Sequence, residues 1–113
     1  MRYSLKIQYT FEREAKRLSK RYPSMKSDIA LLCEDISANP NLGTDLSGGL
    51  RKIRMAITSK GHGKSGGARV ITFTVIVSVE EAVINLLTIY DKSERESISR
   101  SEILALLEKN SLR

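Results

Sequence analysis

Residues 68–90 read ARVITFTVIVSVEEAVINLLTIY, and this stretch decides the fold. β-branched residues occupy both faces of residues 68–79, which is typical of a strand at the centre of a sheet. The polar pair Glu80–Glu81 predicts a turn, and residues 82–90 then predict a second strand. Upstream, residues 50–57 (LRKIRMAI) alternate between apolar and mostly basic side chains and predict a strand as well. Three consecutive strands of this kind predict an antiparallel meander.

The flanking segments predict one more strand and three helices. In chain order we expect a strand at 2–9, a helix between Thr10 and Pro23, a helix between Ser24 and Asn39, a loop at 41–49, and a final helix that begins at Ser99. Ser99 and Glu102 have the spacing of a capping box. The order β-α-α-β-β-β-α predicts one α+β domain over residues 1–113, in which the helices cover one face of the sheet.

The composition excludes several classes of protein. The 113 residues are 41% apolar and 28% charged, which is the balance of a folded globular domain. One cysteine and one histidine exclude an internal disulfide and a Cys/His zinc site. We expect no metal and no cofactor, as the resemblance described below implies. No apolar run reaches the length of a membrane span, and we expect a cytoplasmic protein without a membrane partner.

The charge is distributed unevenly along the chain. The net charge is +6, and residues 50–79 carry six basic residues and no acidic one. Such an acid-free basic block predicts a local surface for phosphate or another anion, rather than a merely solvated strand and loop.

A glycine-rich loop lies inside this basic block. Residues 58–67 (TSKGHGKSGG) contain Gly61, Gly63 and Gly66 in a G-x-G-x-x-G pattern, but a strand follows instead of a helix. The pattern therefore predicts neither a dinucleotide site nor a phosphate-binding P-loop. Its glycines allow the backbone to approach a ligand closely, and its basic side chains favour an anion.

Several short motifs, taken in order, resemble the RelE/ParE toxin superfamily and above all the HigB-like toxins of bacterial type II toxin–antitoxin modules. The motifs are YPS at 22–24, NP at 39–40, GGLRKIRMA at 48–56, KGHGKSGGARVI at 60–71 and LLTIYDKSE at 86–94. The resemblance implies a small α+β toxin that cleaves mRNA on the ribosome without a metal. It also implies a cognate antitoxin, most often of helix-turn-helix type, as the protein partner.

The resemblance also implies the residues of the site. The catalytic set would be Lys52, Arg54, Arg69, Tyr90 and Lys92. Lys52 would take the proton of the attacking 2′-hydroxyl, because neighbouring positive charge favours its neutral form. Arg54 and Arg69 would hold the charged phosphate with their planar forks. Tyr90 would stack on a base or orient the phosphate, and Lys92 would protonate the leaving oxygen. Further contacts to RNA would come from Arg13, Lys16, Arg17, Lys20, Arg51, Lys60, His62 and Lys64.

Two points leave the chemistry open. RelE itself carries a catalytic tyrosine in its last helix, whereas residues 98–113 contain none, and either Ser93 or Arg95 matches its arginine after the last strand. Arg69 also alternates in phase with Ile71 and Phe73, so we expect it at the strand entrance or beside a bulge. A DNA gyrase inhibitor of the ParE type and an RNA-binding module without chemistry remain the alternatives.

Overall fold

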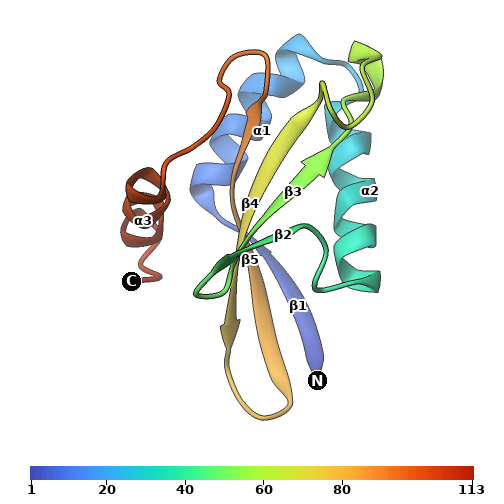
Figure 1. Cartoon of the computed structure of the whole chain (residues 1–113). Helices are drawn as coiled ribbons and strands as arrows, with labels where there is room; N and C mark the ends of the chain where they lie inside the picture. Colours follow the sequence, from blue (N-terminus) through green and yellow to red (C-terminus); the bar gives the residue numbers. More distant parts are fainter.

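Five strands form one mixed sheet in the order β1-β5-β4-β3-β2 in the computed structural model, which describes residues 1–113 (Figure 1). The elements in chain order are β1 (Arg2–Ile7), α1 (Tyr9–Arg21), α2 (Met25–Ala38), β2 (Thr44–Ser47), β3 (Leu50–Met55), the 3-10 helix η1 (Thr58–Lys60), β4 (Ala68–Ile76), β5 (Glu81–Asp91) and α3 (Arg100–Lys109). β1 runs parallel to β5, and every other neighbouring pair is antiparallel. The predicted α+β class is confirmed.

β4 and β5 lie at the centre of the sheet because both are apolar on both faces. In β4 the consecutive residues Val70 and Ile71 point to opposite faces, and both are fully buried. The pairing of β4 with β5 slips by one residue between Ile71 and Thr72, which leaves Leu87 without a partner in β4. This bulge reverses the phase of β5, so that Tyr90 shares the face of Arg69, its partner across the ladder.

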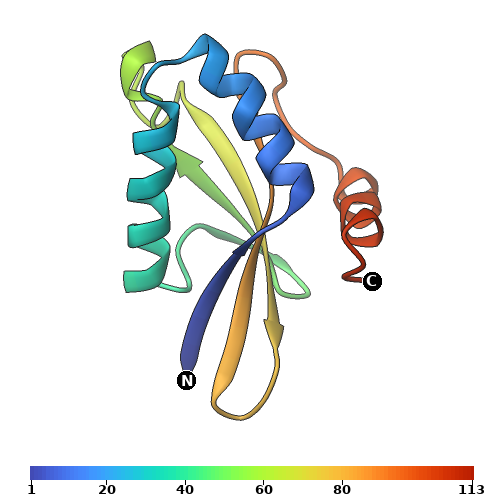
Figure 2. The ribbon, with the colours of Figure 1, turned by 180° about the vertical axis from the view of Figure 1, so that it is seen from behind.

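The two faces of the sheet carry separate cores. α1 and α2 cover one face, where Phe11, Leu18 and Met25 pack against strand residues such as Ile53 and Val70 (Figure 2). α3 covers part of the opposite face, and its Ile103 and Leu107 pack against the strand residues Leu50, Ile71 and Leu87. The prediction that all helices share one face is therefore wrong for α3. α3 lies on the other face because β3, β4 and β5 carry apolar side chains there as well, and their burial against α3 is favourable.

Residues 44–47 form the strand β2, although the sequence predicts a loop there. This edge strand has no apolar alternation and exists through its pairing with β3. Its end is irregular, because Ser47 has a φ of 73°. The capping box of α3 is present as predicted, with Ser99 and Glu102 each accepting from the other's backbone N–H.

Thr10 lies within α1 and is not its cap; its hydroxyl donates to the carbonyl of Leu87. None of the helices has both the length and the apolar character that crossing a bilayer requires.

Candidate functional site

Four of the five predicted catalytic residues lie on one face of three adjacent strands. Arg54 of β3 pairs with Arg69 of β4, and Arg69 pairs with Tyr90 of β5, so these three form a row across the sheet. Lys52 lies two residues along β3 from Arg54 and therefore on the same face. Neighbouring strands are about 4.8 Å apart, so the row brings the Cα atoms of β3 and β5 to roughly 10 Å. This is the face opposite α1 and α2, because Ile53 and Met55 pack into the other core.

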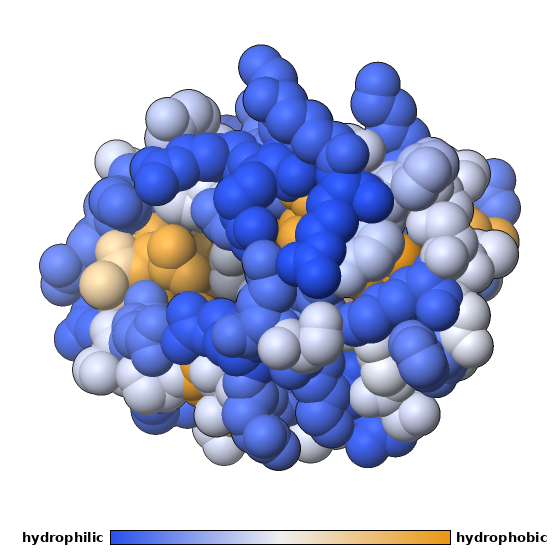
Figure 3. Space-filling view, turned by 90° about the horizontal axis from the view of Figure 1, so that it is seen from above, coloured by the Kyte–Doolittle hydropathy of each residue, from blue (hydrophilic) through white to orange (hydrophobic).

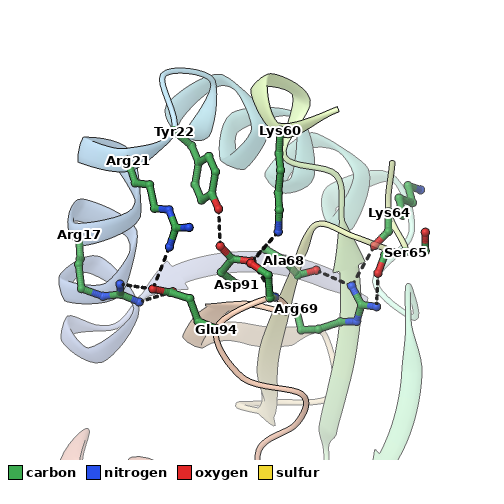
Figure 4. Close-up of polar contacts among 11 residues, drawn as sticks. Arg17, Arg21, Tyr22, Lys60, Lys64, Ser65, Ala68, Arg69, Asp91 and Glu94 are labelled. Carbon is green, nitrogen blue, oxygen red and sulfur yellow. Dashed lines mark hydrogen bonds and ion pairs between the residues drawn. The ribbon is translucent and has the colours of Figure 1, made fainter. Parts of the chain in front are cut away.

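The Arg69 side chain binds the backbone at the C-terminal end of the glycine-rich loop. Only 5% of the residue is exposed. Its guanidinium donates to the backbone carbonyls of Lys64 at 2.9 Å, Ser65 at 3.2 Å and Ala68 at 3.1 Å (Figure 4). A single side chain thus fixes the end of the loop where β4 begins. Arg69 is the second residue of β4, which agrees with its predicted position at the strand entrance. The contact of Arg69 with a phosphate stays a prediction.

The other end of the loop is anchored on Asp91, which is completely buried. One carboxylate oxygen accepts from Lys60 Nζ at 2.8 Å and from Ser93, and the other accepts from the Tyr22 hydroxyl at 2.5 Å (Figure 4). Burial by itself would raise the pKa of Asp91, but these hydrogen bonds outweigh burial and hold that pKa well below its usual range. Asp91 thereby joins the end of α1, η1 and the segment after β5.

A second buried carboxylate fastens η1 to α2. Asp28 accepts from the backbone N–H of Thr58 at 2.9 Å, from the Thr58 hydroxyl at 2.6 Å and from the Ser24 hydroxyl at 2.7 Å. Burial opposes the charge of Asp28, yet the hydrogen bonds from Thr58 and Ser24 leave its pKa lowered. The loop is therefore held at three points: Asp28 and Asp91 at η1, and Arg69 at the start of β4.

Three of the predicted RNA-binding cations have partners within the fold. Lys60 is paired with Asp91 at 2.8 Å, and only 14% of its side chain is exposed. Arg17 is paired with Glu94 at 2.9 Å and with Glu14 at 3.1 Å. Arg51 donates to the carbonyls of Leu42 and Gly43, away from the face of Lys52. These three cations are less available to a phosphate than the sequence suggests.

The other basic residues that the sequence assigns to the site form no ion pair. They are Arg13, Lys16 and Lys20 on α1, and Lys52, Arg54, His62, Lys64, Arg69 and Lys92 on the strands and loops. Lys52, Arg54 and Lys64 line a cleft of about 310 Å³ between β3, α2 and the loop. His62 and Lys92 line a shallower depression of about 360 Å³ that also contains Lys60 and Ser93.

The loop that Arg69 holds contributes to both hollows: Lys64 lines the cleft, and His62, Ser65 and Gly66 line the depression. Viewed down this end of the sheet, long hydrophilic side chains cross the surface and hydrophobic atoms appear only between them (Figure 3). The cleft is lined by Asp28 and Asp35 as well as by Lys52, Arg54 and Lys64, and these three cations suit a phosphate chain, which is stabilised by several positive charges at once.

Tyr90 completes the row at β5 but is covered. Only 5% of the residue is exposed, and its hydroxyl has no hydrogen-bond partner. Burial raises the pKa of the phenol, and the nearby charges of Arg69 and Arg95 oppose this effect. The guanidinium carbon of Arg95 lies 5.6 Å from the centre of the Tyr90 ring. Arg95, which the sequence left as one of two matches to the RelE arginine, is thus the one that lies against Tyr90.

Sequence reasoning missed the acidic residues that organise the site. Asp28, Asp91 and Glu94 hold cations or loop backbone in place, and no sequence pattern assigned any of them to the site. The one available signal was Asp91 directly after the buried strand. No group of three or more His, Cys, Asp or Glu side chains gathers where it could hold a metal ion. No protein-family model matches the chain.

Proposed function

We propose that this protein is the toxin of a type II toxin–antitoxin module, a ribosome-dependent endoribonuclease that cuts mRNA without a metal. One observation carries the proposal: Lys52, Arg54, Arg69 and Tyr90 share one sheet face in adjacent register beside a loop held at three points. The resemblance of the sequence to HigB-like toxins supports the same conclusion from the motifs. The strand order and the antiparallel run from β2 to β5 are compatible with a RelE-like fold.

The proposed chemistry is transfer of a phosphodiester to the neighbouring 2′-oxygen. Lys52 takes the proton of the 2′-hydroxyl, and the 2′-oxygen forms a bond to phosphorus while the bond to the 5′-oxygen breaks. Arg54 stabilises the charge that develops on the phosphate oxygens, because a planar fork can bind two of them. Lys92 gives a proton to the leaving 5′-oxygen. Arg69 acts through the loop, since its N–H groups already bind three backbone carbonyls.

The proposal includes a protein partner that silences the toxin. Lys52, Arg54 and Lys64 line one cleft and have no acidic partner of their own in an ion pair. An antitoxin segment with acidic side chains would complement this surface and exclude the RNA. Binding of such an antitoxin would weaken as salt rises, because exposed charges are screened within about 10 Å at 0.1 M salt.

The deciding experiment is cleavage of mRNA on programmed ribosomes in the presence of EDTA. We expect the wild-type protein to cut, and Lys52→Ala and Arg54→Ala to lose about a hundred- to a thousandfold in rate. Lys6→Ala and Lys26→Ala are matched controls, because both are exposed lysines outside the cleft and the depression. Control variants that lose as much activity as Lys52→Ala would refute the site.

The two alternatives give different outcomes in the same set of assays. A ParE-like inhibitor would block DNA supercoiling by gyrase and leave ribosome-bound mRNA intact. A binding module without chemistry would protect RNA on the ribosome and not cut it. Either outcome would refute the proposed nuclease.

A further inference from the structure

β1 is a free edge of the sheet. It comes first in the strand order, pairs only with β5, and keeps an unbroken register with it from Arg2 to Ile7. Its N-terminal end extends past the helices (Figures 1 and 2). The other edge strand, β2, is shorter and has a bulge between Asp45 and Ser47, which protects that edge from further pairing. β1 is therefore the edge at which the sheet can accept another strand.

The unpaired backbone groups of β1 belong to its odd-numbered residues. The N–H groups of Arg2 and Gln8 donate to carbonyls of β5 and of the turn before it. Successive residues of a strand direct their backbone groups to opposite sides. The N–H and C=O groups of Tyr3, Leu5 and Ile7 therefore point away from the sheet, toward solvent.

The same odd-numbered positions expose apolar side chains. The exposed fractions are 59% for Met1, 39% for Tyr3, 43% for Ile7 and 67% for Tyr9, which begins α1. Half of the large apolar side chains that the protein exposes thus lie within its first nine residues. Leu5 packs into the core beneath α1 and α2, so Tyr3 and Ile7 belong to that same face. A row of apolar side chains along an unpaired strand indicates a surface that binds a protein.

An apolar groove adjoins the C-terminal end of this row. It has a volume of about 490 Å³, lies between α1 and α2, and is lined by Ile7 together with Phe11, Ala15 and Ile29. Residues directly opposite each other in an antiparallel pair have Cβ atoms about 4.5–5.5 Å apart. A side chain opposite Ile7 on an added strand would therefore lie beside the groove.

We propose that β1 pairs antiparallel with β1 of a second copy of this chain, around a twofold axis at Leu5. In this register Tyr3 faces Ile7, Leu5 faces its own copy, and Met1 lies next to Tyr9. The outward N–H and C=O groups of these facing residues then bond to each other in pairs. The exposed apolar side chains cover one another, and the Tyr3 ring of the second copy lies beside the groove at Ile7.

Charge selects this register over its neighbours. Lys6 is the one cation of β1 without an ion pair, because Arg2 is bound to Glu81 at 2.7 Å. In the proposed register Lys6 faces Ser4, which is neutral. Arg2 faces Gln8, which is neutral as well. A shift of two residues places Lys6 opposite Arg2 in one direction and opposite its own copy in the other, and like charges that face each other are destabilising. A shift of one residue places apolar side chains opposite polar ones.

The dimer leaves the basic face open. Lys52 and Arg54 lie on the face opposite α1 and α2, and β3 is separated from β1 by β4 and β5. The twofold axis is perpendicular to the sheet at its edge, so both copies present this face on the same side. The inference therefore does not depend on the proposed nuclease, and a failure of either leaves the other standing.

The test begins with sedimentation equilibrium of the full chain, from low micromolar to submillimolar concentration. We expect a reversible equilibrium between monomer and dimer. Amide hydrogen exchange measured by NMR on the same samples locates the interface. The N–H groups of Tyr3, Leu5 and Ile7 should exchange more slowly as the dimer fraction rises, whereas those of β2 should not change.

Two substitutions of Ser4 test the register. Ser4→Glu places a carboxylate opposite Lys6 and should tighten the dimer, whereas Ser4→Lys should weaken it. Each change should be about threefold to tenfold, because the twofold axis repeats the facing pair. In the register shifted so that Lys6 faces Arg2, Ser4 would face its own copy, and both variants would weaken the dimer. The same two substitutions at Ser101, an exposed serine of α3, are the matched control and should have no effect.

A double variant tests the apolar row. Tyr3→Lys/Ile7→Lys sets positive charges opposite each other and should abolish the dimer. The matched control Leu31→Lys/Val77→Lys changes two exposed apolar residues away from the β1 edge and should dimerise normally. Melting temperatures show whether each variant is folded, and the Ser4 variants decide the matter if the double variant is not.

A wild-type protein that stays monomeric at every concentration would overturn the inference and assign the edge to a strand of another protein. A dimer that tolerates Tyr3→Lys/Ile7→Lys in a folded variant would overturn it too. A dimer that both Ser4 variants weaken, or that neither changes, would refute the proposed register.

Discussion

Replacing Asp91 by asparagine removes the charge on which the glycine-rich loop is anchored. Asp91 is completely buried, and Lys60, whose ammonium it holds at 2.8 Å, is mostly covered. Removal of one partner from a buried ion pair usually costs about 3–5 kcal/mol, because the other charge is left uncompensated. Asparagine keeps an acceptor for Tyr22 or Ser93, so we expect a loss of about 3 kcal/mol. For a domain of this size that corresponds to a fall in melting temperature of roughly 12 °C.

The assay is urea unfolding of four proteins: the wild type, Asp91→Asn, Lys60→Met and the double variant. The double variant should be less destabilised than the sum of the single variants, because it removes both charges together. A loss below about 1 kcal/mol in Asp91→Asn, together with additive single effects, would refute the idea that this pair anchors the loop.

The same pair predicts a pH dependence with a definite sign. The pKa of Asp91 is lower in the folded protein than the usual value of about 3.9, so the folded state favours the charged form. The resulting stabilisation is complete above that usual value and is lost as pH falls toward the folded pKa. The difference in unfolding free energy between wild type and Asp91→Asn should therefore shrink as pH falls below about 4. A difference that grows on acidification would contradict the assignment.

Three further predictions concern single residues of the basic face. Lys52→Ala and Arg54→Ala should change the free energy of unfolding by no more than about 0.5 kcal/mol, since neither forms an ion pair, and calorimetry of both variants checks this. Tyr90→Phe should stabilise the free protein by roughly 1 kcal/mol, because it removes an unpartnered buried hydroxyl; a clearly lower melting temperature would show that the hydroxyl has a partner. Arg69→Ala should release the carbonyls of Lys64 and Ser65 and make the loop faster to cut by trypsin at Lys64, whereas the matched surface change Arg2→Ala should not alter that rate.

Local patterns in the sequence were enough to place Lys52 and Arg54 on one face of β3. Lys52 and Arg54 alternate with Ile53 and Met55, and a period of two puts the basic pair on the face away from that core. The central strands and the capping box of α3 follow in the same way from residues close together in the chain.

What the sequence could not show depends on partners far along the chain. Lys60 is 31 residues from Asp91 in the chain, and Tyr22 is 69 residues from it. Nothing in the local sequence therefore indicates that these side chains bind Asp91. The phase of Tyr90 likewise depends on a bulge opposite Ile71, without which strict alternation would place it among the residues facing α1. β2 has no alternation of apolar and polar residues, and it forms because its backbone pairs with the exposed edge of β3.

The parallel pairing of β1 with β5 also constrains how the protein is made. Arg2 pairs with Glu81 and Ile7 with Leu86, a separation of 79 residues. During synthesis the first strand therefore waits, unpaired, until the fifth has left the exit tunnel, and the row from Arg54 to Tyr90 is completed only at that late stage. Its nascent chain has no assembled basic face while most of it is still being translated. A protein proposed to act on translating ribosomes would thus spare, by its topology alone, the ribosome that is producing it.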